Sequence, residues 1–311
     1  MRTLVGLEAL EAPEHGSSLT IGTFDGVHLG HRALIARALA RASGAGAAAT
    51  VVTWDRHPDV TLRPERTPPL LTPPERKIEL IAETGVEVVV VLPFDEELSR
   101  WSPERFVADV LVAGLGARHV SVGAGWRFGR RASGDVALLQ RLGERHGLEA
   151  ESVPLAQVGG APVSSSRVRA AVAAGDLDLA HCLLGRPFDM QGIVVHGAHR
   201  GRSLGYPTAN LVSDPRSAHP PRGVYAGVAV VEGSRRAAAI NVGVNPTFGG
   251  EEATTPLRVE AYLLDFDGDL YGRLLRVEFH RRLRDELRFD SVAELVEQMA
   301  RDVEETREPT C

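Results

Sequence analysis

The chain has 311 residues, a length typical of two domains. Its composition, with 43% hydrophobic and 24% charged residues, is ordinary for a folded globular protein. The net charge of −6 excludes a general nucleic-acid binder, which needs a basic excess to neutralise a phosphate backbone. The start, MRTLVGLEALEAPEHG, is too short and acidic for a signal peptide, and no apolar run approaches a membrane span. Two isolated cysteines form no disulfide framework, so we expect a cytoplasmic protein with Cys182 buried on a helix.

The first part of the chain alternates strand-like and helix-like segments. The expected strands are Ser18–Thr23, Ala47–Trp54, Val86–Leu92, Arg118–Gly123 and Leu148–Val153. The expected helices are Gly30–Ser43, Pro73–Thr84, Pro103–Ala113 and Gly134–His146. Val86–Leu92 is continuously apolar, as in a parallel strand that is buried on both faces. This rhythm predicts an α/β domain with a Rossmann-like open parallel sheet and helices on both sides.

After Leu184 the pattern changes to short strands separated by Gly and Pro turns. The expected strands are Phe188–His196, Val224–Glu232, Arg236–Val242, Arg258–Leu264 and Leu274–Phe279. Such a run without helices is typical of a small β-barrel or a sandwich, and an amphipathic helix at Ser291–Glu305 closes it. We place the domain boundary between the ranges 1–185 and 186–311.

A first candidate site lies where the first strand runs into the first helix. Ligands of open α/β sheets collect at the carboxyl ends of strands, and a helix start suits phosphate. Three glycines let the backbone approach a ligand, namely Gly22, Gly26 and Gly30. His28 and His31 share one face of the first turn and could donate hydrogen bonds to a phosphate. The alternatives are a helix cap, or a zinc site, which lacks a third ligand nearby in the sequence.

A second segment, Ser164 to Arg169, opens another helix with three hydroxyls and an Arg at one end. Hydroxyls at a helix start often only cap it, but with an Arg they could also hold a triphosphate.

Farther on, the Gly-rich and Arg-rich run from Gly197 to Gly205 is either a hairpin loop or a phosphate cradle. Thr208 and Asn210, two apart on a strand, project to one face and carry the oxygen donors that Mg²⁺ accepts; a polar solvent face is the alternative.

At these residues the chain resembles the bacterial bifunctional riboflavin kinase/FAD synthetases over nearly its whole length. Gly22 to His31 is similar to G-x-F-D-G-V-H-x-G-H, and Ser164 to Arg169 to S-S-T-x-I-R, with Ser166 in place of Thr. The resemblance implies that the N-terminal domain adenylylates FMN to FAD, with His28 and His31 catalytic. It implies ATP or phosphate contacts at Gly22, Phe24, Asp25, Gly26, Ser164, Ser165, Ser166 and Arg169.

The C-terminal part resembles riboflavin kinases in several strings. Gly205 to Asn210 is similar to G-[FY]-P-T-A-N, Asn241 to Phe248 to N-x-G-x-x-P-T-F, and Val259 to Phe266 to V-E-x-x-[IL]-L-D-F. The resemblance implies a kinase that uses Mg²⁺ with ATP, and the chain has no Walker A motif. The implied roles are Mg²⁺ binding by Thr208 and Asn210, and phosphate binding by Gly197, Arg202, Gly205 and Pro207.

Glu260 is the catalytic base that this resemblance implies. A primary alcohol loses its proton as it attacks the γ-phosphate, and a positioned carboxylate can accept it. The alternative is a surface charge on an alternating strand. Arg284, near the last helix, is implied to contact flavin or phosphate, or else belongs to an exposed Arg-rich turn.

Two positions depart from the family pattern. Arg56 precedes His57-Pro58 where relatives usually have P-H-P, and Gly125 replaces a polar Asp or Asn before Trp126 and Phe128. Because a lost buried hydrogen-bond partner costs about 1–3 kcal/mol, adenylyl transfer could be weakened or altered in substrate preference. Trp126 and Phe128 are our flavin-binding candidates, with Trp126 stacking on a ring or serving as a core aromatic.

Three functions follow as hypotheses. The first is a bifunctional enzyme that makes FMN and then FAD; the second is a riboflavin kinase with a weakened or altered adenylyltransferase half. The third is a non-catalytic flavin-binding regulator, which has no need of a general base. The expected partners are the small molecules riboflavin, FMN, FAD and ATP, without nucleic acid or membrane. The sequence leaves open the oligomeric state, including a homo-oligomer, the selectivity among flavin analogues, and channelling between the domains.

Overall fold

The computed structural model describes residues 1–197, 204–244 and 257–307. Contacts between Cα atoms divide the chain into two compact units. The first consists of Met1–Leu70 with Pro74–Ser165, and the second of Leu71–Pro73 with Ser166–Cys311. Each unit is described by itself.

The first unit is built on a parallel sheet of six strands in the order β1-β4-β3-β2-β5-β6. The strands are β1 Arg2–Val5, β2 Ser17–Ile21, β3 Ala48–Trp54, β4 Val88–Leu92, β5 Ala117–Gly123 and β6 Glu149–Val153. The main helices are α1 Leu29–Ala45, α3 Pro74–Ala82, α5 Pro103–Arg105, the π-helix η2 Phe106–Gly114 and α6 Val136–His146. Shorter elements are α2 Pro58–Leu62, η1 Pro64–Arg66, α4 Glu96–Ser99, η3 Arg130–Ala132, and the small hairpin β7 Gln157–Val158 with β8 Ala161–Pro162. The predicted open parallel sheet is confirmed.

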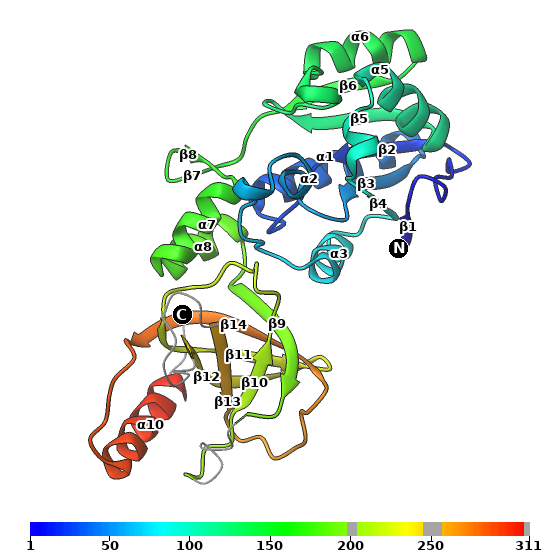
Figure 1. Cartoon of the computed structure of the whole chain (residues 1–311). Coiled ribbons are helices and arrows are strands. Elements are labelled where there is room, and N and C mark those ends of the chain that lie inside the picture. Colours follow the sequence, from blue (N-terminus) through cyan, green and yellow to red (C-terminus); the bar gives the residue numbers. More distant parts are fainter. Residues whose placement is uncertain (198–203, 245–256, 308–311) are drawn as a thin grey trace. The chain divides into compact units, whose positions relative to one another are not determined.

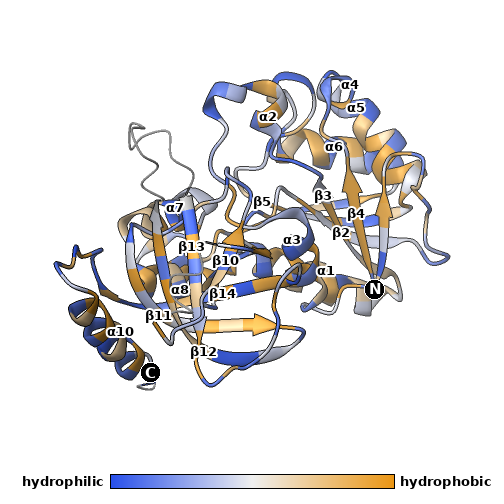
Figure 2. Ribbon diagram, turned by 60° about the horizontal axis from the view of Figure 1, so that its bottom comes forward, coloured by the Kyte–Doolittle hydropathy of each residue, from blue (hydrophilic) through white to orange (hydrophobic). Residues whose placement is uncertain are grey.

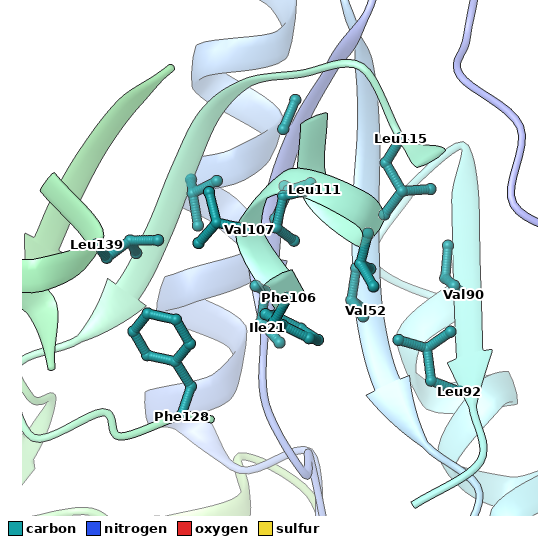
Figure 3. Close-up of a cluster of buried hydrophobic side chains, with 14 of the residues drawn as sticks. Ile21, Val52, Val90, Leu92, Phe106, Val107, Leu111, Leu115, Phe128 and Leu139 are labelled. Atoms are coloured by element: carbon teal, nitrogen blue, oxygen red, sulfur yellow. The ribbon is translucent and has the colours of Figure 1, made fainter. Parts of the chain in front are cut away.

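Alternate residues of the central strands enter two separate cores, as the period of two of a strand requires. Val90 and Leu92 of β4 pack with η2 and α6, in the core that Figure 3 shows around Phe106 and Leu111. Val89 and Val91 of the same strand pack on the other face, with apolar residues of α1 and α3. Helices therefore cover both faces of the sheet (Figure 1), and the carboxyl ends of the strands are left for a ligand site.

The second unit is a closed antiparallel barrel in the order β10-β13-β12-β11-β14-β9, which confirms the predicted barrel. Its strands are β9 Phe188–Val195, β10 Ala209–Val212, β11 Gly223–Val231, β12 Ser234–Val244, β13 Leu257–Leu263 and β14 Leu274–Arg284. Side chains such as Leu211, Ile240, Val259 and Phe279 are buried inside the barrel. The last helix, α10 Val292–Arg307, packs against β11 and β12, and Figure 2 shows hydrophobic and hydrophilic residues alternating along it.

Helices α7 (Ser165–Ala174) and α8 (Leu177–Leu184) join the barrel's unit by contacts, from Ser166 on, although we expected a boundary at 185/186. That expected boundary stays a prediction. Cys182 on α8 is exposed, so the expectation that it is buried was wrong. The buried face of α8 carries Ala180 and Leu183, and a residue two positions from Ala180 points to the opposite side of a helix.

Glu278 on β14 predicts how the barrel responds to acid. Arg235 binds both of its carboxylate oxygens, at 2.9 and 2.6 Å. Burial alone raises the pKa of Glu278, but hydrogen bonds from His280 and Arg235 outweigh it and lower the pKa to about 2. A depressed carboxyl pKa contributes stability that is present above the unfolded value and lost as the pH falls toward the folded value.

We therefore expect the barrel to lose stability between pH 4.5 and about 2, and the Glu278→Gln variant to lose less over that range. Urea unfolding of both proteins at stepped pH measures this. Glu232→Gln, which removes an exposed partner of Arg273, is the matched control and should follow the wild type. Parallel acid curves for wild type and Glu278→Gln would contradict the prediction.

Candidate functional sites

The loop between β2 and α1 has a strained backbone that buried side chains hold in place. Phe24, Gly26 and Val27 have φ values of 52°, 87° and 38°, in the left-handed region that a β-branched residue such as Val rarely adopts. Phe24 and Val27 are fully buried in the core beside α1 and α3. Their burial offsets the strain, so the loop keeps one shape at the end of β2.

The two predicted histidines lie together at the start of α1. His28 is the N-cap residue, and its Nδ1 accepts a hydrogen bond from the backbone N–H of His31 at 3.3 Å. The two rings stack at 3.6 Å between centroids, with 14° between their planes. A Cβ on Gly30 would lie 3.1 Å from His28 Cε1, so glycine leaves room for this stack. The helix-cap and phosphate-donor interpretations are therefore compatible, because the cap uses Nδ1 and leaves Nε2 of His28 as the ring's donor.

His31 is held neutral by its surroundings. Burial lowers its pKa well below the usual range, and the neighbouring His28 and Lys77 lower it further. Among the described residues its Nδ1 is buried and has no hydrogen-bond partner. A neutral imidazole offers a polarised N–H to a ligand without adding a full positive charge.

The positive charge at this site comes from Lys77 on α3, the only lysine of the chain. It is 6% exposed, and its Nζ donates to the carbonyls of Trp54, at 2.7 Å, and of Thr23, at 3.3 Å. Lys77 thus ties the end of β3 to the strained loop. Burial lowers the pKa of Lys77 to about 8, against the opposing effect of the carboxylates of Asp25 and Asp55. A single lysine inside a helix belongs to no motif, so the role of Lys77 was not predictable from the sequence.

The predicted serine segment meets the same loop. Ser165, the first residue of α7, donates from Oγ to the carbonyl of Asp25 at 2.8 Å. The carbonyl of Val163 lies 3.5 Å from where a Cβ of Gly30 would stand. The first unit therefore brings the segment up to Ser165 against the loop that carries Asp25 and His28. Ser166 and Arg169 belong to the second unit, so their role at this site stays a prediction.

The aromatic pair beyond β5 packs on itself. Trp126 and Phe128 stack at 4.5 Å with 14° between their planes. Phe128 is buried in the core (Figure 3), and half-buried Trp126 packs against that core. Both interpretations of Trp126 stay open, because one face is packed and part of the ring is exposed. Gly125 is exposed, and a Cβ there would meet no atom within 4 Å, so packing does not force glycine at this position.

The other unusual position, Arg56, points to a structural role. Its Nη2 contacts Asp55 Oδ2 at 2.6 Å, while Asp55 also accepts from the backbone N–H of Phe94. His57 caps α2, with its Nδ1 accepting from the N–H of Asp59 at 3.1 Å. Arg56 therefore neutralises a carboxylate at the carboxyl end of β3.

In the second unit, strand register places three polar side chains in one row. Asn210 of β10 is paired with Glu260 of β13, which is paired in turn with Asn241 of β12. Since paired residues in an antiparallel sheet share a face, all three lie on the outer face, opposite to inward residues such as Val259 and Ala261. Thr208, just before β10, donates from Oγ1 to Glu260 Oε2 at 3.3 Å. The structure thus brings together Thr208, Asn210 and Glu260, as the sequence predicted.

Arg258 is an unpredicted member of this cluster. Its Nε lies 2.7 Å from Glu260 Oε1, and it donates from Nε to Asn210 Oδ1, also at 2.7 Å, with a second donation from Nη2 to the same oxygen. The side chains of Arg258 and Glu260 are 23% and 24% exposed. Alternation along β13 could have placed Arg258 on the face of Glu260, because the two residues are two positions apart on one strand.

A cavity of about 330 Å³ adjoins the row of polar residues. Its walls include the polar side chains of Thr208, Asn241 and Glu260 and the aromatic side chains of Tyr262 and Phe289. Further walls come from α10, through residues such as Leu295, Met299 and Val303. A mostly apolar cavity with a few convergent polar groups has the character of a small-molecule site.

Arg284 lines this cavity, but its guanidinium forms an ion pair with a residue of α10. Its Nη2 lies 2.6 Å from Asp302 Oδ2, and its Nε donates to Oδ1 at 2.9 Å. Asp302 is 5% exposed and also accepts from Gln298 at 2.9 Å. The predicted exposed Arg-rich turn is therefore wrong for Arg284, which anchors α10; its predicted contact with flavin or phosphate stays untested.

The remaining predicted residues lie near the same cluster or outside the described part of the chain. Gly205 has φ of 85°, and Pro207 directly precedes Thr208. A Cβ on Gly197 would collide with the amide of Asn210 and the guanidinium of Arg258. Arg202 and the segment 245–248 fall outside the described residues.

Comparisons with known proteins agree with this division of the chain. Residues 10–167 match the family model described as FAD synthetase, and residues 184–310 match the model described as riboflavin kinase. The two matches define a protein that joins two transferase domains of flavin-cofactor synthesis.

Similarity to whole proteins makes the assignment more specific. The chain is 40% identical over 307 residues to a bifunctional riboflavin kinase/FMN adenylyltransferase from Pseudomonas fluorescens, covering 99% of this chain and 97% of the relative. It is 37% identical over 310 residues to the protein of that name from Escherichia coli, with the same coverage. The chain belongs to the family of bifunctional riboflavin kinase/FMN adenylyltransferases.

The fold is shared along the whole chain with a solved structure. A crystal structure described as a macrolide-efflux protein from Streptococcus pneumoniae has a TM-score of 0.86 and 30% identity, and the match covers 99% of each chain. In the part of our chain that the structure describes, no helix is long and apolar enough to cross a membrane.

Replacing Lys77 by Met tests its role in the first site. The variant removes the ammonium from the carbonyl of Trp54, and a buried acceptor without its donor costs about 1–3 kcal/mol. We expect the first unit to unfold at lower temperature and FAD formation from FMN to fall. Arg100→Met, which breaks the exposed pair with Glu96, is the control and should leave both unchanged. Equal behaviour of the two variants in calorimetry and in the FAD assay would contradict the role.

Replacing Asp302 by Asn tests the anchor of α10. Removing one partner of a buried ion pair costs about 3 kcal/mol or more, so the second unit should be destabilised and bind riboflavin more weakly. Glu297→Gln, which breaks an exposed pair with Arg301 on the same helix, is the matched control. Chemical unfolding and quenching of riboflavin fluorescence measure the two effects. If Asp302→Asn matched Glu297→Gln in both, the anchor would have no role.

Proposed function

We propose that this chain converts riboflavin to FAD in two steps. The second unit transfers the γ-phosphoryl group of ATP to riboflavin, giving FMN and ADP. The first unit transfers the adenylyl group of a second ATP to FMN, giving FAD and pyrophosphate. The observation that carries the kinase half is the row Asn210–Glu260–Asn241 beside a cavity of about 330 Å³.

In the kinase step, Glu260 is the proposed general base. The flavin ring would occupy the apolar part of the cavity, with the ribityl hydroxyl directed at Glu260. As the hydroxyl oxygen attacks the γ-phosphorus, its proton passes to the carboxylate, and ADP leaves with the electrons of the broken P–O bond. Thr208 donates to the other carboxylate oxygen and so orients the base.

The donor set also fits a divalent cation. The hydroxyl of Thr208, the amide oxygen of Asn210 and the carboxylate of Glu260 are all hard oxygen donors, and a guanidinium already bridges two of these groups. We propose that Thr208 and Asn210 hold Mg²⁺ that enters with ATP. The cation would neutralise charge on the phosphates during transfer.

In the adenylyl step, the first unit positions the reacting phosphates. A phosphate oxygen of FMN attacks the α-phosphorus of ATP, and pyrophosphate leaves. We propose that His28 and His31 donate hydrogen bonds to phosphate at the start of α1, where backbone N–H groups and the helix dipole also favour an anion. Lys77 supplies a positive charge that its hydrogen bond to the carbonyl of Thr23 holds at the loop. Because both steps consume ATP, we propose a cytoplasmic location.

Product analysis tests both halves in one experiment. Riboflavin and Mg-ATP are mixed with the enzyme, and ADP, FMN, pyrophosphate and FAD are measured over time. The proposal expects FMN with ADP first, then FAD with pyrophosphate. Intact ATP would refute it, and accumulation of FMN without FAD would restrict the function to the kinase and implicate Gly125 and Arg56.

Two variants separate the sites within one chain. Glu260→Gln should slow ADP formation from riboflavin about 10²–10⁴-fold, the usual contribution of a general base, and leave FAD formation from FMN unchanged. His31→Asn should slow FAD formation from FMN and leave ADP formation from riboflavin unchanged. Each retained activity shows that the unit without the substitution is folded, and riboflavin binding shows the same for the barrel of Glu260→Gln. Unchanged riboflavin phosphorylation by Glu260→Gln would rule out the assigned base.

A further inference from the structure

One guanidinium occupies the meeting point of the groups that the kinase step needs. Arg258 contacts the Oε1 of Glu260 at 2.7 Å and donates to the Oδ1 of Asn210 through both Nε and Nη2. Asn210 is 8% exposed, so its amide oxygen has little access to water. The lone pairs of this oxygen are thus engaged by a cation that belongs to the protein itself.

A divalent cation that binds Asn210 needs the same oxygen. Mg²⁺ and a guanidinium cannot both hold it closely, since two cations at one small acceptor repel each other strongly at low dielectric. Free Mg²⁺ would have to displace the guanidinium of Arg258 from Asn210 and then lie beside a second cation that its pair with Glu260 keeps nearby. Free metal is therefore disfavoured.

ATP changes this balance, because its phosphates offer the displaced guanidinium a new partner. Arginine binds phosphate through two parallel hydrogen bonds. The loop predicted to cradle phosphate begins at Gly197, where a Cβ would collide with the guanidinium of Arg258 and the amide of Asn210. Gly197, the first residue of this predicted cradle, therefore lies against the arginine that must move.

We propose that Arg258 couples metal to nucleotide in the kinase site: it excludes free Mg²⁺ from Asn210 and admits Mg²⁺ together with ATP. This inference rests on the proposed riboflavin kinase function. Arg258 is a positioning residue here, because it acts through the oxygen donors and not on the transferred group. By linkage, the factor by which nucleotide raises the affinity for metal equals the factor by which metal raises the affinity for nucleotide.

The test measures affinity for free Mn²⁺, as a spectroscopic stand-in for Mg²⁺, by electron paramagnetic resonance without nucleotide. We expect Arg258→Gln to bind Mn²⁺ about fivefold or more tightly than the wild type, in the range of ordinary coupling between sites. The gain should vanish in Arg258→Gln combined with Asn210→Ala. Unchanged or weaker binding by Arg258→Gln, or a gain that survives loss of Asn210, would overturn the proposal.

Two controls separate this inference from the proposed function. Arg273→Gln removes an exposed arginine of the same unit and should bind Mn²⁺ like the wild type. Binding of riboflavin, measured by quenching of its fluorescence, reports whether the second unit of Arg258→Gln is folded. If the wild type failed to phosphorylate riboflavin, the proposed function would fall. If it phosphorylated riboflavin but Arg258→Gln gained no affinity for Mn²⁺, only the role of Arg258 would fall.

Discussion

The register of three strands determines the second site. Asn210, Glu260 and Asn241 face the outside of the barrel because β10, β13 and β12 pair at these residues. A slip of β13 by one residue would turn Glu260 into the barrel's interior, away from Asn210 and Asn241, and expose neighbours such as Val259. The burial of these apolar neighbours therefore maintains the arrangement of the polar row, and closure of the barrel leaves no edge strand free to slip.

The first site depends on a different constraint, the burial of a strained loop. Phe24 and Val27 have unfavourable backbone conformations, which their packing against α1 and α3 offsets. Lys77 adds a polar tie between this loop and β3. The result is a rigid start for α1, with stacked histidines that differ in role: His28 caps the helix, while His31 stays neutral at neutral pH.

Most regular elements were predictable because their patterns are local. The continuous apolar run of β4 and the Gly and Pro turns of the barrel indicated both folds. The short strand β1 was missed, because its four residues sit at the sheet edge and are not fully buried. The helix expected at Pro103–Ala113 is a short α-helix followed by a π-helix, a backbone change that no residue type signals.

Within the sites, the residues that belong to motifs were predictable and their neighbours were not. His28, Thr208, Asn210 and Glu260 stood in strings that indicate chemistry. Arg258 and Lys77 act through contacts with groups that are distant in sequence, Asn210 for the one and Trp54 for the other. Such roles follow from register and packing, which a single sequence does not specify residue by residue.

Because Lys77 is the only lysine of the chain, its chemical modification can report local opening of the first unit. Reagents that acylate amines need an accessible, uncharged ε-amino group, and the chain's single lysine is 6% exposed with its Nζ held by two carbonyls. Its acylation thus requires the first unit to open locally, and a mass spectrometer can count that event at one defined position.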